Sequence, residues 1–185
     1  ARKFVEYEAK ATAMYKYLAH SVPGLLQTEA YAREILCMGH PWCTAGEVEE
    51  KVAARLDRQQ LLSGAAPPLL WVVLDEAVIR RPVGGAATMR EQLAHILDAA
   101  QSPNVEVQVL PFAAGCHAVM GSSLTLLSFK GASDVVYLEG DHFGELVEEP
   151  TAVARHAHRY HLVHALALPP AASLAFIQQA LEDLD

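Results

Sequence analysis

Five polar residues have the side-chain types that binding or acid/base chemistry needs, and each lies beside a predicted strand end or helix edge: Arg58, Gln59, Glu76, His117 and Glu139. Loops at strand ends often form binding pockets. A guanidinium binds a carboxylate through paired hydrogen bonds, and a carboxylate binds an amine, so this set suits a small polar ligand. Glu76, His117 and Glu139 are also the residues that would transfer protons in an enzyme. Their spacing leaves open whether the five residues meet.

Four histidines lie on one predicted helix, 150–166, and raise the question of a metal site. Zinc requires three or four ligands that converge on one point. Helical geometry directs His156 and His164 to one side and His158 and His161 to another. We therefore expect surface histidines, with His158, His161 and His164 as the candidate ligands if a metal binds, and we expect no cofactor.

Several other kinds of chemistry lack their sequence signals. The chain has no G-x-x-x-x-G-K-[ST] or G-x-G-x-x-G phosphate loop and no G-x-S-x-G nucleophile motif. Its three cysteines have no C-x-x-C spacing, so we expect separate thiols rather than a disulfide framework or a zinc site. The net charge of −8 is unsuited to neutralising phosphates, so this chain is not expected to bind DNA by itself.

Helices are predicted first, from apolar spacing and capping residues. Apolar residues at three- to four-residue spacing predict a helix over 4–19. Thr28 is a predicted N-cap for a helix to about residue 38. Thr44 and Glu47 form a capping-box pattern that opens a helix to about residue 62.

The rest of the chain predicts a sheet with helices packed on it. A continuous apolar run predicts a buried strand over 69–74. Further strands are predicted over 104–110, 123–129 and 134–139, and the alternation of the strand over 104–110 indicates that it is half-buried. Helices are predicted over 87–100, 150–166 and 170–184. We expect one α+β domain, 1–185, with a small, mainly antiparallel sheet of about four strands and about six helices.

Two acids, Asp75 and Glu76, follow the buried strand directly. Burial of an unpaired carboxylate is costly, so both are expected to meet arginines. The expected partners are Arg80, Arg81 or Arg58.

A larger set of segments resembles a known family: Ser21–Arg33 (SVPGLLQTEAYAR), Arg55–Gln60, Leu74–Arg80, Pro82–Gly85, Val109–Pro111, Gly115–His117 and Val135–Glu139. The chain resembles the domain of unknown function that follows an Xre/Cro-type helix-turn-helix in actinobacterial transcriptional regulators, some of which are antitoxin-like. The resemblance implies that DNA contact belongs to an N-terminal module absent from this chain. It also adds weight to a functional role for Arg58, which lies in one of the shared segments.

Composition indicates a folded protein of the cytoplasm. Hydrophobic residues make up 52% of the 185 residues and charged residues 19%, values typical of a globular domain. No apolar run approaches the roughly 20 residues of a membrane span, and no secretory signal is present, so no membrane partner is expected.

Three functions remain open from the sequence. The first is a sensor or interaction domain of a regulator, which binds a small polar ligand or a small partner protein. The second is a family member recruited as an enzyme of specialised metabolism, with Glu76, His117 and Glu139 as its acid/base residues. The third is a module that forms a homodimer through a large apolar patch.

Overall fold

The centre of the fold is a mixed sheet in which the strand order is β3-β2-β1-β4-β5-β6. The computed structural model describes residues 2–141 and 143–184. In this part of the chain, β1 (Ala13–Leu18), β2 (Leu69–Asp75) and β3 (Val105–Leu110) run parallel. β4 (Ser123–Phe129), β5 (Ala132–Glu139) and β6 (Gly144–Val147) complete the sheet through antiparallel pairs, with β4 beside β1.

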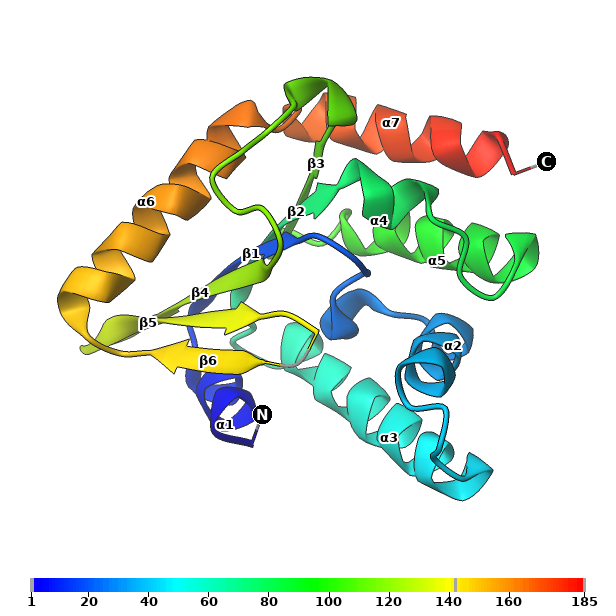
Figure 1. Ribbon diagram of the computed structural model, residues 1–185, viewed down its shortest axis with the longest axis horizontal. Coiled ribbons are helices and arrows are strands. Elements are labelled where there is room, and N and C mark those ends of the chain that lie inside the picture. The colour runs from blue at the N-terminus through cyan, green and yellow to red at the C-terminus, as the bar shows by residue number, and fades with distance from the viewer. Residues whose placement is uncertain (1, 142, 185) are drawn as a thin grey trace.

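Helices cover the two faces of the sheet unequally (Figure 1). One face, the multihelix face, packs against α1 (Arg2–Lys10), α2 (Glu29–Gly39), α5 (Ala86–Ala99) and α7 (Pro170–Glu182), and α3 (Ala45–Arg58) packs on α2 on the same side. The short α4 (Glu76–Arg80) follows β2 on the same side. The other face packs against α6 (Pro150–Leu166) and is called the α6 face below.

The observed sheet corrects the predicted one. The α+β class is confirmed, but the described residues form six strands rather than about four, and seven α-helices rather than about six. The sheet is mixed rather than mainly antiparallel, because β2 pairs in parallel with both of its neighbours. β3 is also more buried than predicted, since four of its residues beyond Glu106 lie inside the core.

The largest error lies in the segment predicted as one helix over 4–19. Only α1 is helical, and β1 follows it after a short break. The residues of β1 include good helix formers, yet the strand occupies the middle of the sheet, where both of its faces are covered. Met14 packs into the multihelix core while Tyr17 packs into the α6 core, which is the alternation of a strand. Tertiary packing thus overrides local helix propensity.

The second missed strand is β6, which begins at Gly144 in a stretch, 140–145, that was predicted as a loop. Its four residues are too few to show a clear alternation, and pairing with β5 supplies their hydrogen bonds. His142 of that stretch lies outside the described residues.

Helix starts agree closely with the prediction. The Thr28 hydroxyl accepts a hydrogen bond from the Tyr31 N–H, and Thr44 and Glu47 form the reciprocal capping box. The predicted helices over 87–100, 150–166 and 170–184 correspond to α5, α6 and α7. Within the described chain no single helix is long and apolar enough to cross a membrane; α6 and α7 pass that test only as a pair, which is bent by 68°.

Candidate functional site

The carboxyl ends of β1, β2 and β3 lie along one edge of the sheet because the three strands are parallel. The segment 111–122 starts at the end of β3 and enters β4 on the far side of β2 and β1, so it crosses this edge. Figure 1 shows the crossing segment in green in front of the sheet. Open sheets with parallel strands characteristically bind ligands at the carboxyl ends of their strands.

A three-residue hydrogen-bonded chain holds the crossing segment to the sheet. The Tyr17 hydroxyl lies 3.1 Å from Asp75 Oδ2 and 3.1 Å from His117 Nε2. The backbone N–H of Val119 donates to His117 Nδ1 at 3.2 Å. Because Nδ1 is an acceptor, the neutral ring carries its hydrogen on Nε2 and donates it to Tyr17 oxygen, which leaves the Tyr17 proton for Asp75.

Burial keeps the side chains of His117 and Tyr17 in their neutral forms. Burial lowers the pKa of His117, and the nearby carboxylate of Asp75 offsets only part of that effect. Burial also raises the pKa of Tyr17, and Asp75 raises it further by repulsion and by accepting its hydrogen bond. At neutral pH the arrangement is therefore a neutral imidazole and a neutral phenol beside one carboxylate.

Glu76 fastens the start of the crossing segment. Its Oε2 accepts a hydrogen bond of 2.7 Å from the Phe112 N–H, and its Oε1 lies 3.1 Å from Arg80 Nε. The expected arginine partner is thus confirmed for Glu76. Asp75 instead uses Oδ1 to cap α4 through the Ala77 N–H and Oδ2 to bind Tyr17.

Arg58 and Gln59 lie on the multihelix face and make different contacts. Arg58 Nη2 donates to Glu8 Oε1 at 2.7 Å, beside a hollow of about 240 Å³ between α1 and α3. Gln59 Nε2 donates to the carbonyl oxygens of Gly24 and Gln27, at 2.9 and 2.7 Å. These contacts join α3 to α1 and to the segment after β1.

Glu139 ends β5 at the same edge as Glu76 and His117, where its side chain is exposed. It is close enough to Arg55 to raise the pKa of that guanidinium, although burial and the neighbouring Arg58 lower it more. Within residues 2–141 and 143–184, no hydrogen bond or ion pair joins any two of Arg58, Gln59, Glu76, His117 and Glu139. The structure brings three of the five to one edge and places the other two, Arg58 and Gln59, at the end of α3.

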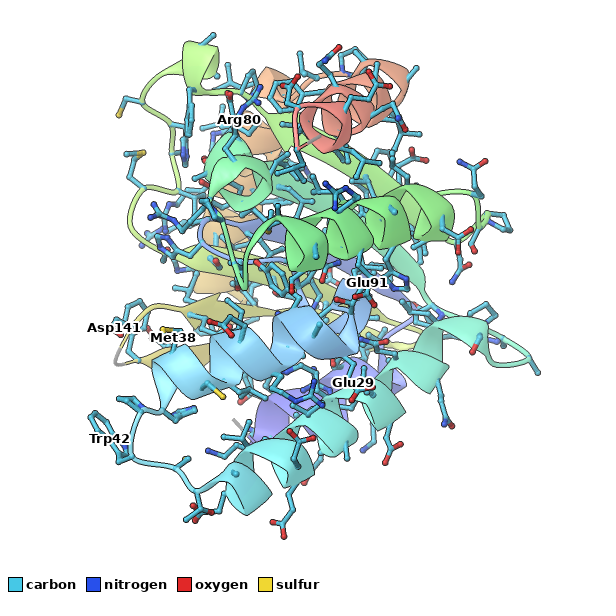
Figure 2. All side chains as sticks on the ribbon, turned by 90° about the vertical axis from the view of Figure 1, so that its right-hand side faces the viewer. Glu29, Met38, Trp42, Arg80, Glu91 and Asp141 are labelled. Atoms are coloured by element: carbon cyan, nitrogen blue, oxygen red, sulfur yellow. The ribbon has the colours of Figure 1, made fainter. Side chains whose placement is uncertain are left out.

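Large apolar side chains are exposed in the loops at this edge and, on the same side of the molecule, at the end of α2. Phe112 and Met120, in the crossing segment, are 60% and 61% exposed, and Phe143, between β5 and β6, is 50% exposed. Met38 and Trp42, at the end of α2 and just after it, are 71% and 85% exposed. Figure 2 shows Met38, Trp42 and Asp141 of the β5–β6 connection on one side of the molecule. These five apolar residues define what is called the carboxyl-end surface below.

Tyr17 and Asp75 are the members of the site that sequence reasoning did not assign to it. Asp75 carried a signal, since it is an acid at the end of a buried strand. Tyr17 stood out only as one of several aromatic residues in a segment predicted as helix, so its place at the end of a strand was missed. The apolar residues of the surface gave no signal, since exposure cannot be read from residue type.

The histidines of α6 contact neighbours separately. His164 Nε2 lies 2.8 Å from Gln108 Oε1, and His156 Nδ1 lies 3.0 Å from Arg159 Nη1. His158 and His161 are exposed. Among the residues that the structure describes, no group of three or more His, Cys, Asp or Glu side chains could hold a metal ion.

A family model described as "Domain of unknown function (DUF5753)" matches residues 1–179. The chain belongs to the DUF5753 family. No curated protein and no solved structure matches it. The matched range of this DUF5753 chain includes every element from α1 to α6 and most of α7, so the whole sheet and the crossing segment belong to the family domain.

Proposed function

We propose that this DUF5753 domain is the interaction domain of a helix-turn-helix transcriptional regulator and that it binds a small partner protein through the carboxyl-end surface. The observation that carries the proposal is the exposure, by half or more, of five large apolar side chains on one side of the molecule, three in the loops at the sheet edge and two at the end of α2. Isolated exposed apolar residues are ordinary, whereas several around one surface are typical of binding sites.

The residue types favour a protein partner. Trp and other aromatic side chains dominate the binding energy of many interfaces, and Met adapts its shape to the opposing surface. The hollows found elsewhere on the domain have volumes of about 240 and 290 Å³. Such volumes lie below the usual range of pockets for small molecules.

The hydrogen bonds among His117, Tyr17 and Asp75 hold the crossing segment, and with it part of this surface, in one position. His117, Tyr17 and Asp75 attach the crossing segment to the middle of the sheet, and Glu76 attaches its start. Less conformational freedom is then lost when a partner binds. The resemblance to regulators of the Xre/Cro type supports a role in transcription, with DNA contact made by a separate module, as the net charge of −8 on this chain also suggests.

A second candidate function is an enzyme that uses the same edge. One observation favours it: His117 is only partly buried, its pKa is lowered, and it is linked through Tyr17 to the carboxylate of Asp75. A neutral histidine positioned in this way is able to act as a general base. Glu76, the acid named with it, already uses both carboxylate oxygens within the protein.

The test measures binding to the small proteins encoded next to this gene. Each is purified and titrated into the domain by calorimetry, and the titration is repeated with Trp42→Ala and Phe112→Ala. A central contact of about 2 kcal/mol would weaken binding roughly 30-fold. Leu162→Ala is the matched control, because Leu162 is 47% exposed on α6, away from the proposed surface.

The expected result is loss of affinity in the two surface variants, with an unchanged melting temperature and no effect of the control. Equal affinity of all variants would refute the proposed surface. Self-association that is lost in the Trp42→Ala variant would instead assign the surface to a homodimer.

A further inference from the structure

The α6 face carries a group of aromatic rings that lies apart from the carboxyl-end surface. Tyr15 of β1 and Trp71 of β2 are neighbours in register, with ring centres 6.5 Å apart. Tyr160 of α6 lies 6.2 Å from Tyr15, and His164 lies 5.3 Å from Trp71 and 6.0 Å from Tyr160. Four rings from two strands and one helix thus surround a small area of the sheet.

A glutamine holds two of these rings in place. Gln108 Oε1 accepts a hydrogen bond of 2.6 Å from Trp71 Nε1 and lies 2.8 Å from His164 Nε2. Its Nε2 donates to the carbonyl oxygen of Leu168 at 2.9 Å, which fixes the direction of the amide. Because Oε1 only accepts, His164 Nε2 carries a hydrogen, and the indole and imidazole edges are both turned toward Gln108.

Two polar groups of this area have no hydrogen-bond or ion-pair partner among the residues that the structure describes. The Tyr160 hydroxyl is buried and makes no hydrogen bond within the described chain, although the residue is only 2% exposed. Glu106 is paired in register with Trp71 and faces the same side of the sheet as Gln108. It is half-buried and makes no hydrogen bond or ion pair with any residue that the structure describes. Buried polar groups are nearly always satisfied by protein, water or ligand.

We infer that this aromatic group, with Glu106, binds an organic ammonium cation. The faces of Trp and Tyr rings attract cations, and methylated ammonium groups suit them best because they are weakly hydrated. Glu106 supplies the opposite charge at the edge of the same rings, next to Trp71. The inference does not depend on the proposed partner surface.

The experiment uses choline chloride as the cation and the fluorescence of Trp71 as the signal. The protein has two tryptophans, so Trp42→Phe leaves Trp71 as the single reporter. The neutral control ligand is 3,3-dimethylbutan-1-ol, which has the shape of choline without its charge, and sodium chloride is matched throughout. The expected result is saturable binding of choline that is 2- to 30-fold tighter than binding of the neutral alcohol, as cation–π contacts of about 0.5–2 kcal/mol give.

Two protein variants complete the test. Glu106→Gln should weaken choline binding several-fold, whereas Glu145→Gln, on the same face but on β6, should leave it unchanged. Far-UV circular dichroism confirms that each variant is folded. A Trp71 signal that does not saturate with choline, or equal affinity for choline and the neutral alcohol, would overturn the inference.

Discussion

Replacing Glu8 by glutamine should destabilise the domain by about 3–5 kcal/mol, although the change keeps the size of the side chain. Glu8 is 2% exposed and lies between two cations. Its Oε2 is 2.9 Å from Lys16 Nζ, and its Oε1 is 2.7 Å from Arg58 Nη2. These contacts attach α1 to the central strand and to the end of α3.

The expected loss of stability depends on how easily each cation reaches solvent once Glu8 has lost its charge. The Lys16 side chain is 7% exposed and projects from the middle of the sheet, so it has no route to solvent when Glu8 loses its charge. The Arg58 side chain is 36% exposed and is able to turn outward. A buried cation without a counterion explains most of the loss, and Arg58→Ala should therefore cost less than Glu8→Gln.

Urea and thermal unfolding measure the effect. In a domain of this size, 3–5 kcal/mol corresponds to a fall in melting temperature of about 6–20 °C. The double variant Glu8→Gln with Lys16→Met removes both buried charges and should recover much of the loss. Glu49→Ala is the control: it breaks an exposed pair with Arg33 and should leave the melting temperature nearly unchanged.

The pH dependence gives a second measure of the same contact. Burial raises the pKa of Glu8, but attraction and hydrogen bonds from Lys16 and Arg58 lower it more, so its net pKa lies below 4.5. A lowered folded-state pKa contributes stability that is complete above 4.5 and is lost as the pH falls through the folded-state value. The Glu8→Gln variant should therefore not show the loss of stability that Glu8 causes in the wild-type protein as the pH falls below 4.5.

Two results would refute this reasoning. One is a loss below about 1 kcal/mol in Glu8→Gln, which would mean that Lys16 reaches water after all. The other is equal destabilisation of the single and double variants, which would assign the effect to packing rather than to an unpaired charge.

Two further predictions concern the hydrogen bonds of Tyr17 and His117 that hold the crossing segment. Tyr17→Phe removes the hydroxyl between Asp75 and His117 and should cost about 1–3 kcal/mol in urea unfolding, with faster amide exchange over 111–122; unchanged exchange there would contradict the anchoring role. Because burial lowers the pKa of His117 below its ordinary 6.5, the folded state binds protons less readily than the unfolded state, and stability should fall as the pH drops below about 6.5. His117→Asn should reduce this loss between pH 6.5 and 5, and an identical pH profile in the variant would assign the titration to another group.

Local signals in the sequence were sufficient for many elements. Thr44 and Glu47 satisfy one another's backbone groups within a single turn, so the start of α3 needs no distant residue. The apolar run of β2 likewise indicates a strand buried on both faces, whatever its neighbours are. The chain pattern also pointed to polar residues at strand ends, and Glu76 and His117 do lie at the edge where three parallel strands end.

Tertiary structure alone decided the rest. The segment of β1 has helix-forming residues, and only its place between β2 and β4 makes it a strand. Lys16 then faces the buried Glu8, and Tyr17 faces His117, which is 100 residues away in the sequence. Arg58 could be recognised from the sequence as a charge beside an apolar stripe, but its partner could not. Hydrogen bonds and ion pairs between distant segments depend on which strands become neighbours, and no local pattern in a single sequence specifies that pairing.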